Sequence, residues 1–389
     1  MVNIIEGLKS LGGYMDLEAA EEKDAFCSTQ RAIKQINEGL NVTYAALPNG
    51  RKIALLKTML STYCEKNCNY CAFRSGRDFR RCAFTPDQMA RAFMAVYQAG
   101  IVQGLFLSSG VIAGGPKTQD YLIATIELLR NKHQFHGYIH LKLMPGVEQA
   151  QVERSMQIAN RVSLNLEAPN SLRLQVLAPR KNFQVELMRP LTQAQDIRKN
   201  QSPGETWNGR WPSLATQFVI GAVGENDIEL LKTSEYLFNQ IGLTRIYYSA
   251  FKPVSDTPLE KVDTPLLARE FRLYQASYLI RDYGFEMDEF LFDLAGNLPL
   301  ESDPKRLWAE RYLSEAPVEV NHASRRDLLR IPGIGPRSVD YILAARKNGK
   351  LQKLEDLKKI GVNPLLPSRY ILLDGRRPSR QLPLFSEYV

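Results

Sequence analysis

Short apolar runs alternate with longer amphipathic stretches between about residues 51 and 283. Runs of five to seven apolar or alternating residues indicate strands, and apolar residues spaced three and four apart indicate helices. The expected strands are Ile53–Met59, Gly104–Ser108, Tyr138–Leu143, Arg161–Leu166, Ala215–Ile220 and Arg245–Ser249. The helices expected between them include Pro86–Gln98, Asp120–Lys132, Glu148–Ala159, Asn226–Gln240 and Leu266–Asp282. Six β–α repeats predict an α/β fold, a parallel sheet curled into a partial (βα)6 TIM-like barrel.

Prolines and turn residues divide the rest of the chain. We expect five parts: a helical N-terminal extension, the barrel, a Pro-punctuated linker, an all-α helix-hairpin-helix module and an extended C-terminal tail. They cover residues 1–50, 51–299, 300–317, 318–363 and 364–389, in that order. No apolar run approaches the ~20 residues of a membrane span, and we expect no signal peptide.

Three of the five cysteines, Cys64, Cys68 and Cys71, lie within eight residues directly after the first expected strand. So few cysteines in a long chain make no disulfide framework, which indicates metal binding in a reducing cytoplasm. Thiolate is the soft ligand that an iron–sulfur cluster requires, and three ligands leave one iron open. Structural zinc normally takes four ligands, and neither Cys27 nor Cys82 pairs with another cysteine. Zinc is therefore the weaker alternative, and we expect Cys27 and Cys82 to be ordinary buried residues.

The C-x₃-C-x₂-C spacing with an aromatic at Tyr70 resembles the signature of the radical S-adenosylmethionine (AdoMet, SAM) superfamily. The resemblance implies a 4Fe–4S cluster whose open iron binds AdoMet. It implies reductive cleavage of AdoMet to a 5′-deoxyadenosyl radical that abstracts hydrogen, with electrons from a reductant such as flavodoxin or ferredoxin.

Residues just after the strands are candidates for binding AdoMet, because barrel chemistry sits at the C-terminal ends of strands. Ser108, Ser109 and Gly110 stand where the superfamily has a Gly-Gly-Glu-like stretch for the methionyl amine, although this chain has no acid there. A plain strand-to-helix turn is the alternative. Asn165 and Glu167 share one face of the fourth expected strand, where the superfamily binds ribose hydroxyls. A solvent-facing edge is the alternative for these two.

Further candidates follow the remaining strands. Gly221 opens a stretch that resembles the superfamily's adenine-packing element, and Glu225 there is expected in the first turn of a helix. Tyr248 on the sixth strand offers aromatic surface to the base. His140 and Lys142 on the third strand are second-tier contacts for substrate or cofactor. A buried His is more often structural, and Lys142 could instead pair with Glu167.

The C-terminal region holds the basic character of the protein. From residue 321 onward there are 14 Lys and Arg against 6 Asp and Glu, an excess equal to the formal charge of +8 for the whole chain. Within it, Leu328–Val339 reads as a helix-hairpin-helix, with Gly333, Ile334 and Gly335 in the turn. Ser324 is the expected N-cap and Pro336 the expected first residue of the second helix. Exposed N–H groups and the basic residues Arg337, Arg346, Lys347 and Lys350 suit a phosphate backbone, which predicts DNA binding without sequence preference. A protein-binding scaffold or a solubilising surface is the alternative.

The two halves together resemble the DNA modification/repair radical SAM proteins, which join a radical AdoMet barrel to a C-terminal helix-hairpin-helix. The matching residues include Leu105–Val111, Gly137–Lys142, Val162–Glu167 and Ile246–Ala250. The resemblance implies an enzyme of DNA repair or modification, with a uracil-DNA-glycosylase-like protein as a partner. Two other functions stay open: a radical enzyme acting on RNA or a small molecule, and a non-catalytic DNA-binding protein with a structural metal.

The last candidate is the pentapeptide Gln381-Leu382-Pro383-Leu384-Phe385. It resembles the motif by which bacterial repair proteins dock on the sliding clamp, with Gln381, Leu382, Leu384 and Phe385 as the binding residues. A tail folded back on its own barrel is the alternative.

Overall fold

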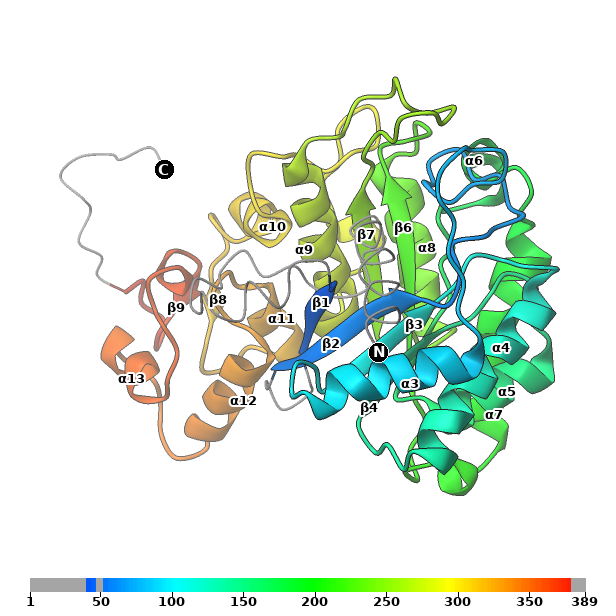
Figure 1. The fold of residues 1–389 in the computed structure, drawn as a ribbon. Coiled ribbons are helices and arrows are strands. Elements are labelled where there is room, and N and C mark those ends of the chain that lie inside the picture. The colour runs from blue at the N-terminus through cyan, green and yellow to red at the C-terminus, as the bar shows by residue number, and fades with distance from the viewer. Residues whose placement is uncertain (1–39, 47–51, 379–389) are drawn as a thin grey trace. The chain divides into compact units, whose positions relative to one another are not determined.

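The computed structural model describes residues 40–46 and 52–378 (Figure 1). Cys27 and the clamp-like motif at residues 381–385 lie outside the described residues, so their roles stay predictions. The chain divides into two compact units. Of the described residues, one unit comprises those up to 225 with 236–266, and the other comprises 226–235 with those from 267 to 378.

A seven-stranded sheet forms the centre of the first unit, with its strands side by side in chain order. Strands β2 to β7 are all parallel, whereas β1 pairs antiparallel with β2. The strands are β1 (Val42–Ala46), β2 (Lys52–Met59), β3 (Gly104–Ser108), β4 (Tyr138–Lys142), β5 (Arg161–Ser163), β6 (Ser213–Ile220) and β7 (Arg245–Ala250). Six parallel strands joined by helical crossovers confirm the predicted partial (βα)6 barrel.

Helices that connect the strands pack beside one another, α3 on α4, α4 on α5 and α5 on α7 (Figure 1). Their bounds are α3 (Pro86–Gln98), α4 (Gly115–Glu127, continued as a π-helix over Leu128–Lys132), α5 (Gln149–Ile158), α6 (Ser171–Leu177) and α7 (Arg189–Asn200). A π-helix, η3 (Phe183–Met188), precedes α7, and a 3-10 turn, η4 (Pro203–Glu205), follows it. Helix α3 begins as its sequence predicts, because Thr85 and Gln88 form a capping box before Pro86.

The prediction of a purely helical N-terminal extension is wrong for residues 42–46, which form β1. The β-branched pair Val42 and Thr43 suits this strand, and the register sets Val42 opposite Leu56 on β2.

Strand β5 is shorter than predicted and ends at Ser163. The hydroxyl of Thr216 on β6 donates to the Leu164 carbonyl at 2.7 Å and accepts the Leu166 N–H at 3.1 Å. This hydroxyl takes the place of two ladder bonds, so the chain leaves the regular sheet there.

The second unit is helical, with a small strand pair. It holds α9 (Leu267–Tyr283), η5 (Met287–Glu289), α10 (Pro304–Tyr312), α11 (Arg325–Arg330), α12 (Pro336–Ala345), α13 (Leu354–Lys359) and η6 (Pro367–Arg369). Helix α8 (Asp227–Asn239) begins in this unit and ends in the first. Strands β8 (Val318–Glu319) and β9 (Ile371–Leu372) pair in parallel, so the module is not all-α.

The core of the second unit gathers apolar side chains of α11, α12 and α13, including Leu328, Val339 and Leu357, which are fully buried. Ile371 and Leu373 belong to the same core. The prediction of an extended tail beginning at residue 364 is therefore wrong for this stretch, because β9 completes the module. None of the described helices is long and apolar enough to cross a membrane.

Candidate functional site

Three thiols border one pocket at the end of β2. Cys64, Cys68 and Cys71 all line this pocket, whose volume is about 140 Å3. The N–H of Leu60 donates to the Ser108 carbonyl at 2.8 Å, so the chain leaves β2 still attached to the end of β3. The loop that carries the cysteines therefore starts from a fixed point at the C-terminal edge of the sheet, where barrel sites lie.

A single arginine, Arg81, holds together the backbone of the loop that carries the cysteines. The Arg81 guanidinium donates hydrogen bonds of 2.7–3.2 Å to four backbone carbonyls, those of Thr62, Phe73, Arg74 and Arg77. It also lies over the Phe79 ring, 4.3 Å from the centroid. Arginine alone among the side chains has the five forked donors that such a bracket needs.

The segment that contains α6 and η3 holds the loop from the other side. Asn69 donates through its side chain to the Val176 carbonyl at 2.8 Å and through its N–H to the Leu177 carbonyl at 2.8 Å. Lys66 donates to the Arg180 carbonyl at 3.1 Å and pairs with Glu186 at 2.8 Å. The residues between the cysteines thus bind backbone and side chains more than 100 positions away.

Gly110 allows β3 to approach the cysteine loop. Its N–H donates to the Ser61 carbonyl at 2.8 Å, and a Cβ placed on it would lie 2.1 Å from the Tyr63 carbonyl oxygen. Beside it, the N–H of Val111 donates to the Cys64 sulfur at 3.4 Å. Only glycine fits where two backbones lie this close.

An ion pair buried in the pocket joins Glu167 to Lys181. The two side chains are 5% and 9% exposed, and their Oε1 and Nζ atoms lie 3.0 Å apart. Glu167 has a left-handed φ of +67°, which a non-glycine residue adopts only when its surroundings impose it. Backbone bonds to β6 impose it here, from Glu167 to Gln217 at 2.9 Å and from Val219 to Glu167 at 2.8 Å.

Two buried acceptors in the pocket make no hydrogen bond of ordinary geometry in the described part of the chain: Oε2 of Glu167, a residue that interacts with Tyr70, and Oε1 of Gln217. Both side chains line the pocket. Buried polar atoms are rarely left unpaired, because each costs about 1–3 kcal/mol. A molecule that presents donor groups, such as hydroxyls or an ammonium group, would satisfy both atoms.

Burial raises the pKa of the Cys68 thiol, and Lys181 opposes that rise. Burial likewise raises the pKa of Cys71 well above its usual range, with a further contribution from Cys68. Burial alone would lower the pKa of Lys181, but the charges of Cys68 and Glu167 raise it, so this lysine is a fixed cation. Burial, and then the negative charge of Glu167, raises the pKa of Tyr70.

The donor set fits an iron–sulfur cluster with a small polar ligand. It offers three soft thiol ligands, a cation to offset their charge and two unpaired acceptors for the ligand's donors. Among residues 40–46 and 52–378, no group of three His, Cys, Asp or Glu side chains is arranged to hold a single metal ion. Cys82 is partly buried and does not line the pocket.

Most of the residues predicted from sequence meet in this pocket. Besides the cysteines it is lined by Tyr70, Ser108, Ser109, Gly110, Lys142, Asn165 and Glu167. Lys142 donates to the Asn165 Oδ1 at 2.6 Å, so the predicted alternative of a Lys142–Glu167 pair is wrong. Lys66, Lys181 and Gln217 were missed, because no spacing in the sequence sets them apart.

Three predicted residues lie elsewhere. His140 is 1% exposed on β4, and its Nε2 is 2.8 Å from the Ser163 hydroxyl. Tyr248 is fully buried in β7, with its ring 6.1 Å from that of Phe218. Gly221 ends β6 with a φ of +86°, and a Cβ there would meet Pro265 at 2.5 Å. None of the three lines the pocket of the cysteines.

Glu225 was expected in the first turn of a helix and is not. It is buried and precedes α8, and its carboxylate accepts the N–H groups of Gly221 and Val223. The Glu225 side chain therefore stabilises the loop between β6 and α8 and does not complement a helix dipole.

In the second unit, the predicted hairpin forms between α11 and α12. Ser324 and Asp327 make the capping box of α11, and Gly333 in the turn has a φ of +80°. Gly335 is the N-cap residue of α12. A second turn follows α13, where Gly361 has a φ of +79°.

The basic residues around the hairpin differ in what they do. Arg337 and Lys347 are exposed. Arg346 instead donates to the carbonyls of Ala323 at 2.7 Å and Val320 at 3.3 Å, and Lys350 pairs with Asp374 at 2.7 Å. Arg337 and Lys347 are therefore the stronger candidates for contact with a polyanion.

Residues 314–362 match the family model of the helix-hairpin-helix motif. The match confirms the predicted module. A comparison with curated protein sequences finds no match.

Solved structures similar to this chain include several radical SAM enzymes. One is the FeFe-hydrogenase maturase HydG from Carboxydothermus hydrogenoformans, 17% identical, covering 58% of this chain and 51% of its own, with a TM-score of 0.46. Methylornithine synthase (PylB) is 16% identical over 58% of this chain and 61% of its own, with a TM-score of 0.46. Coproporphyrinogen III oxidase (HemN) from Escherichia coli is 14% identical over 58% and 52%, with a TM-score of 0.39. The chain thus spans between half and two thirds of the length of these proteins.

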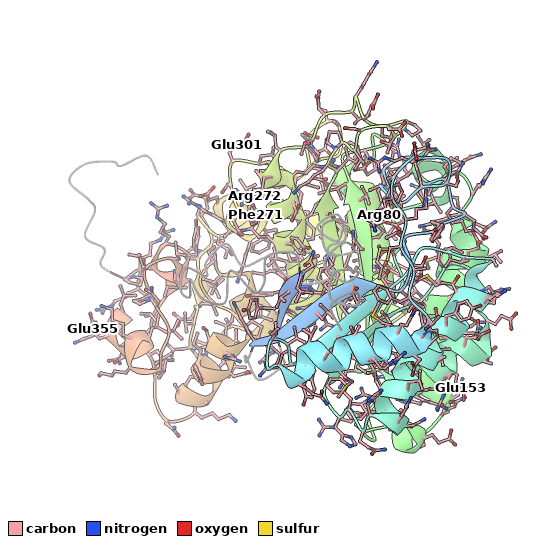
Figure 2. The ribbon with its side chains drawn as sticks, viewed as in Figure 1. Arg80, Glu153, Phe271, Arg272, Glu301 and Glu355 are labelled. Carbon is pink, nitrogen blue, oxygen red and sulfur yellow. The ribbon has the colours of Figure 1, made fainter. Side chains whose placement is uncertain are left out.

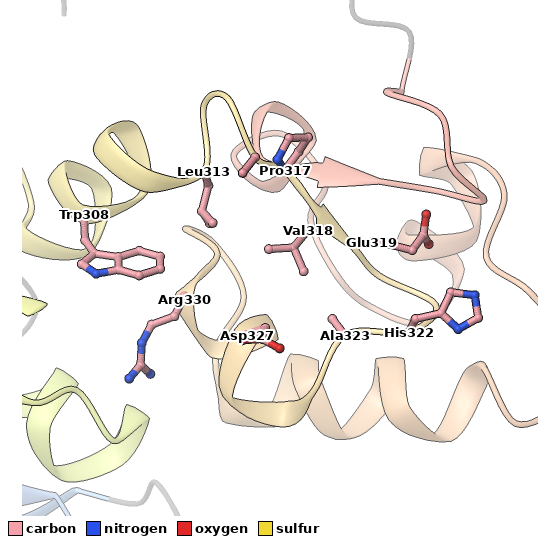
Figure 3. A pocket seen from close by; sticks show the side chains of 10 residues that line it. Trp308, Leu313, Pro317, Val318, Glu319, His322, Ala323, Asp327 and Arg330 are labelled. Carbon is pink, nitrogen blue, oxygen red and sulfur yellow. The ribbon is translucent and has the colours of Figure 1, made fainter.

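A second pocket, with a volume of about 390 Å3, is lined by residues of the second unit. Trp308, Leu313 and Val318 point into it, and Asp327 and Arg330 stand at its side (Figure 3). Its charged groups already serve the fold, because Asp327 caps α11 and Arg330 pairs with Glu289 at 2.6 Å. We therefore assign the chemistry to the pocket of the thiols.

Proposed function

We propose that this protein is a radical AdoMet enzyme acting on DNA. The observation that carries the proposal is the single pocket that gathers Cys64, Cys68 and Cys71 with a buried ion pair and two unpaired acceptors.

The chain's own residues divide the work of binding. The thiolates of Cys64, Cys68 and Cys71 would hold a 4Fe–4S cluster. When bound and reduced, the cluster would supply one electron to the sulfonium of AdoMet, whose cleavage would give methionine and a 5′-deoxyadenosyl radical able to abstract hydrogen. The small residues 108–110 leave backbone groups accessible to the methionyl part. Asn165, Glu167 and Gln217 bring acceptors toward the hydroxyl or amine donors of the ligand.

The DNA part of the proposal is supported by the helix-hairpin-helix module. Its hairpin presents the N-terminus of the ten-residue helix α12, which attracts a phosphate. Arg337 is exposed in the first turn of α12, Lys347 is exposed just beyond its C-terminal end, and the region carries the whole excess of positive charge. We also propose a reductant such as flavodoxin or ferredoxin, a sliding clamp and a uracil-DNA-glycosylase-like protein as partners. The enzyme on RNA or a small molecule, and the non-catalytic metalloprotein, are the competing functions.

Anaerobic reconstitution with iron and sulfide tests the enzyme. We expect about four irons per chain, a 4Fe–4S electron paramagnetic resonance (EPR) signal after reduction, and cleavage of AdoMet. Cys64→Ala, Cys68→Ala and Cys71→Ala should each lose the cluster and the cleavage. Cys82→Ala is the matched control and should keep both. A zinc protein would show no such signal, and full iron content in any of the three variants would overturn the assignment.

Titration with duplex and single-stranded DNA at several salt concentrations tests the substrate class. Wild-type protein should bind without sequence preference, and log K should fall linearly with log salt. Arg337→Gln and Lys347→Gln should each weaken binding and reduce the slope by about one. Lys350→Gln is the control, since Lys350 already pairs with Asp374. Equal binding by all variants would mean that the hairpin is not the DNA contact.

A further inference from the structure

We infer that the Lys181–Glu167 pair sets the reduction potential of the metal centre held by the three cysteines. The inference rests on the proposed function, because it concerns the same cysteines. Neither residue is one of the three predicted metal ligands, and Lys181 lies outside the cysteine motif. Their placement and burial carry the inference.

Lys181 reaches the pocket from the segment between α6 and η3. Its side chain is 9% exposed and lines the pocket together with Cys64, Cys68 and Cys71. A buried charge is screened by water much less than a surface charge, so it acts at full strength on neighbours in the same pocket.

Glu167 opposes that charge from the β6 side of the pocket. Its Oε1 is 3.0 Å from the Lys181 ammonium, and backbone bonds with Gln217 and Val219 hold the residue in its left-handed conformation. Both charges are therefore fixed in place by the fold. Two fixed charges of opposite sign beside a redox centre shift its reduction potential in opposite directions.

The sign of each control follows from electrostatics. Reduction adds one electron to the centre, so a nearby cation stabilises the reduced state and a nearby anion destabilises it. Net charge and solvent exposure are among the properties that set the potentials of iron–sulfur clusters. Removing the Lys181 charge should make the potential more negative, and removing the Glu167 charge should make it less negative.

Redox titration of the reconstituted protein, followed by EPR, tests the inference. At the solution potential where half of the wild-type clusters are reduced, Lys181→Met should have fewer reduced clusters and Glu167→Gln more. The double variant should return close to the wild-type value, because it removes both charges. Lys181→Arg keeps the charge and should stay near wild type.

Lys142→Met tests the sign a second time. Lys142 is also buried in this pocket, 6% exposed, and its ammonium binds the neutral Asn165 at 2.6 Å. Because it removes a second buried cation, Lys142→Met should also make the potential more negative. If these residues only supported the fold, their substitution would lower the iron content and would not shift the potential in a direction set by charge. Iron per chain is therefore measured in every variant.

Four outcomes decide the matter. Shifts of opposite sign with full iron content support the inference. Shifts of the same sign in Lys181→Met and Glu167→Gln, or no shift, in variants that hold their clusters overturn it. Failure of wild-type protein to assemble a cluster would instead overturn the proposed function. If Lys181→Met or Glu167→Gln loses its cluster, the double variant and Lys181→Arg can still be compared with wild type. A reduction potential far from the wild-type value in either of them would count against the inference.

Discussion

Gly110→Ala should displace the cysteine loop from the end of β3. The new Cβ would lie 2.1 Å from the Tyr63 carbonyl oxygen, 2.9 Å from the Tyr63 carbonyl carbon and 3.1 Å from the Cys64 Cβ. Ordinary carbon–oxygen contacts are about 3.3 Å or longer, so the two backbones must separate by about 1 Å. Because the obstacles are backbone atoms, no side-chain rotation relieves the clash.

The cost can be worked from the contacts that a separation would weaken. Overpacking of this kind costs about 1–3 kcal/mol. The Gly110–Ser61 bond of 2.8 Å and the Glu65–Val111 bond of 2.9 Å would stretch as well. At about 0.5–1.5 kcal/mol for each bond, they bring the expected loss of unfolding free energy to about 2–6 kcal/mol.

Urea unfolding of the apoprotein, followed by circular dichroism, measures that loss as a lower midpoint with an unchanged slope. The second measurement is iron bound per chain after reconstitution, which should fall because Cys64 moves. Gly204→Ala is the control, since its nearest new contact is Ser202 Oγ at an ordinary 3.5 Å. It should change stability by no more than about 0.5 kcal/mol. A Gly110→Ala protein with the wild-type midpoint and full iron content would refute the reasoning.

Two further predictions concern Arg81, which is half-buried, and Lys305, which is buried. Arg81→Met should leave four carbonyls of the cysteine loop without their donor, which should lower the iron content and reduce the unfolding free energy by several kcal/mol. Arg80→Met is the control: the Arg80 side chain is exposed (Figure 2), and its loss should change neither quantity. Equal effects of the two substitutions would disprove the role of Arg81 in holding the loop. Burial lowers the pKa of Lys305 to about 7, with Asp303 opposing and Arg330 reinforcing the shift. The unfolded lysine stays protonated to about 10.4, so unfolding takes up a proton between these values and the unfolding free energy rises with pH, by at most about 1.4 kcal/mol per unit. Lys305→Met should remove that rise, and a variant that keeps the wild-type pH dependence in urea unfolding would contradict the assignment.

The sequence by itself determined the order and type of most elements. Helix α3 and strand β3 were predicted with their observed bounds, because their apolar spacing and caps are local properties. The cysteine spacing and the hairpin turn around Gly333 are local as well. A motif formed by neighbouring residues can be read from the chain without knowing the fold.

The tertiary structure decided how the pocket is completed. Lys181 and Gln217 meet Glu167 there from positions 14 and 50 residues along the chain, and the sheet brings them together. Strand β5 ended early because the Thr216 hydroxyl on β6 replaced its ladder bonds, which no pattern within β5 could reveal. His140 lies on the same face of β4 as Lys142, but its ring contacts the Ser163 hydroxyl on β5, and Tyr248 packs against Phe218, so neither lines the pocket. Side-chain alternation is local, but burial and charge pairing depend on contacts between segments far apart in sequence, and these form only when the whole barrel closes.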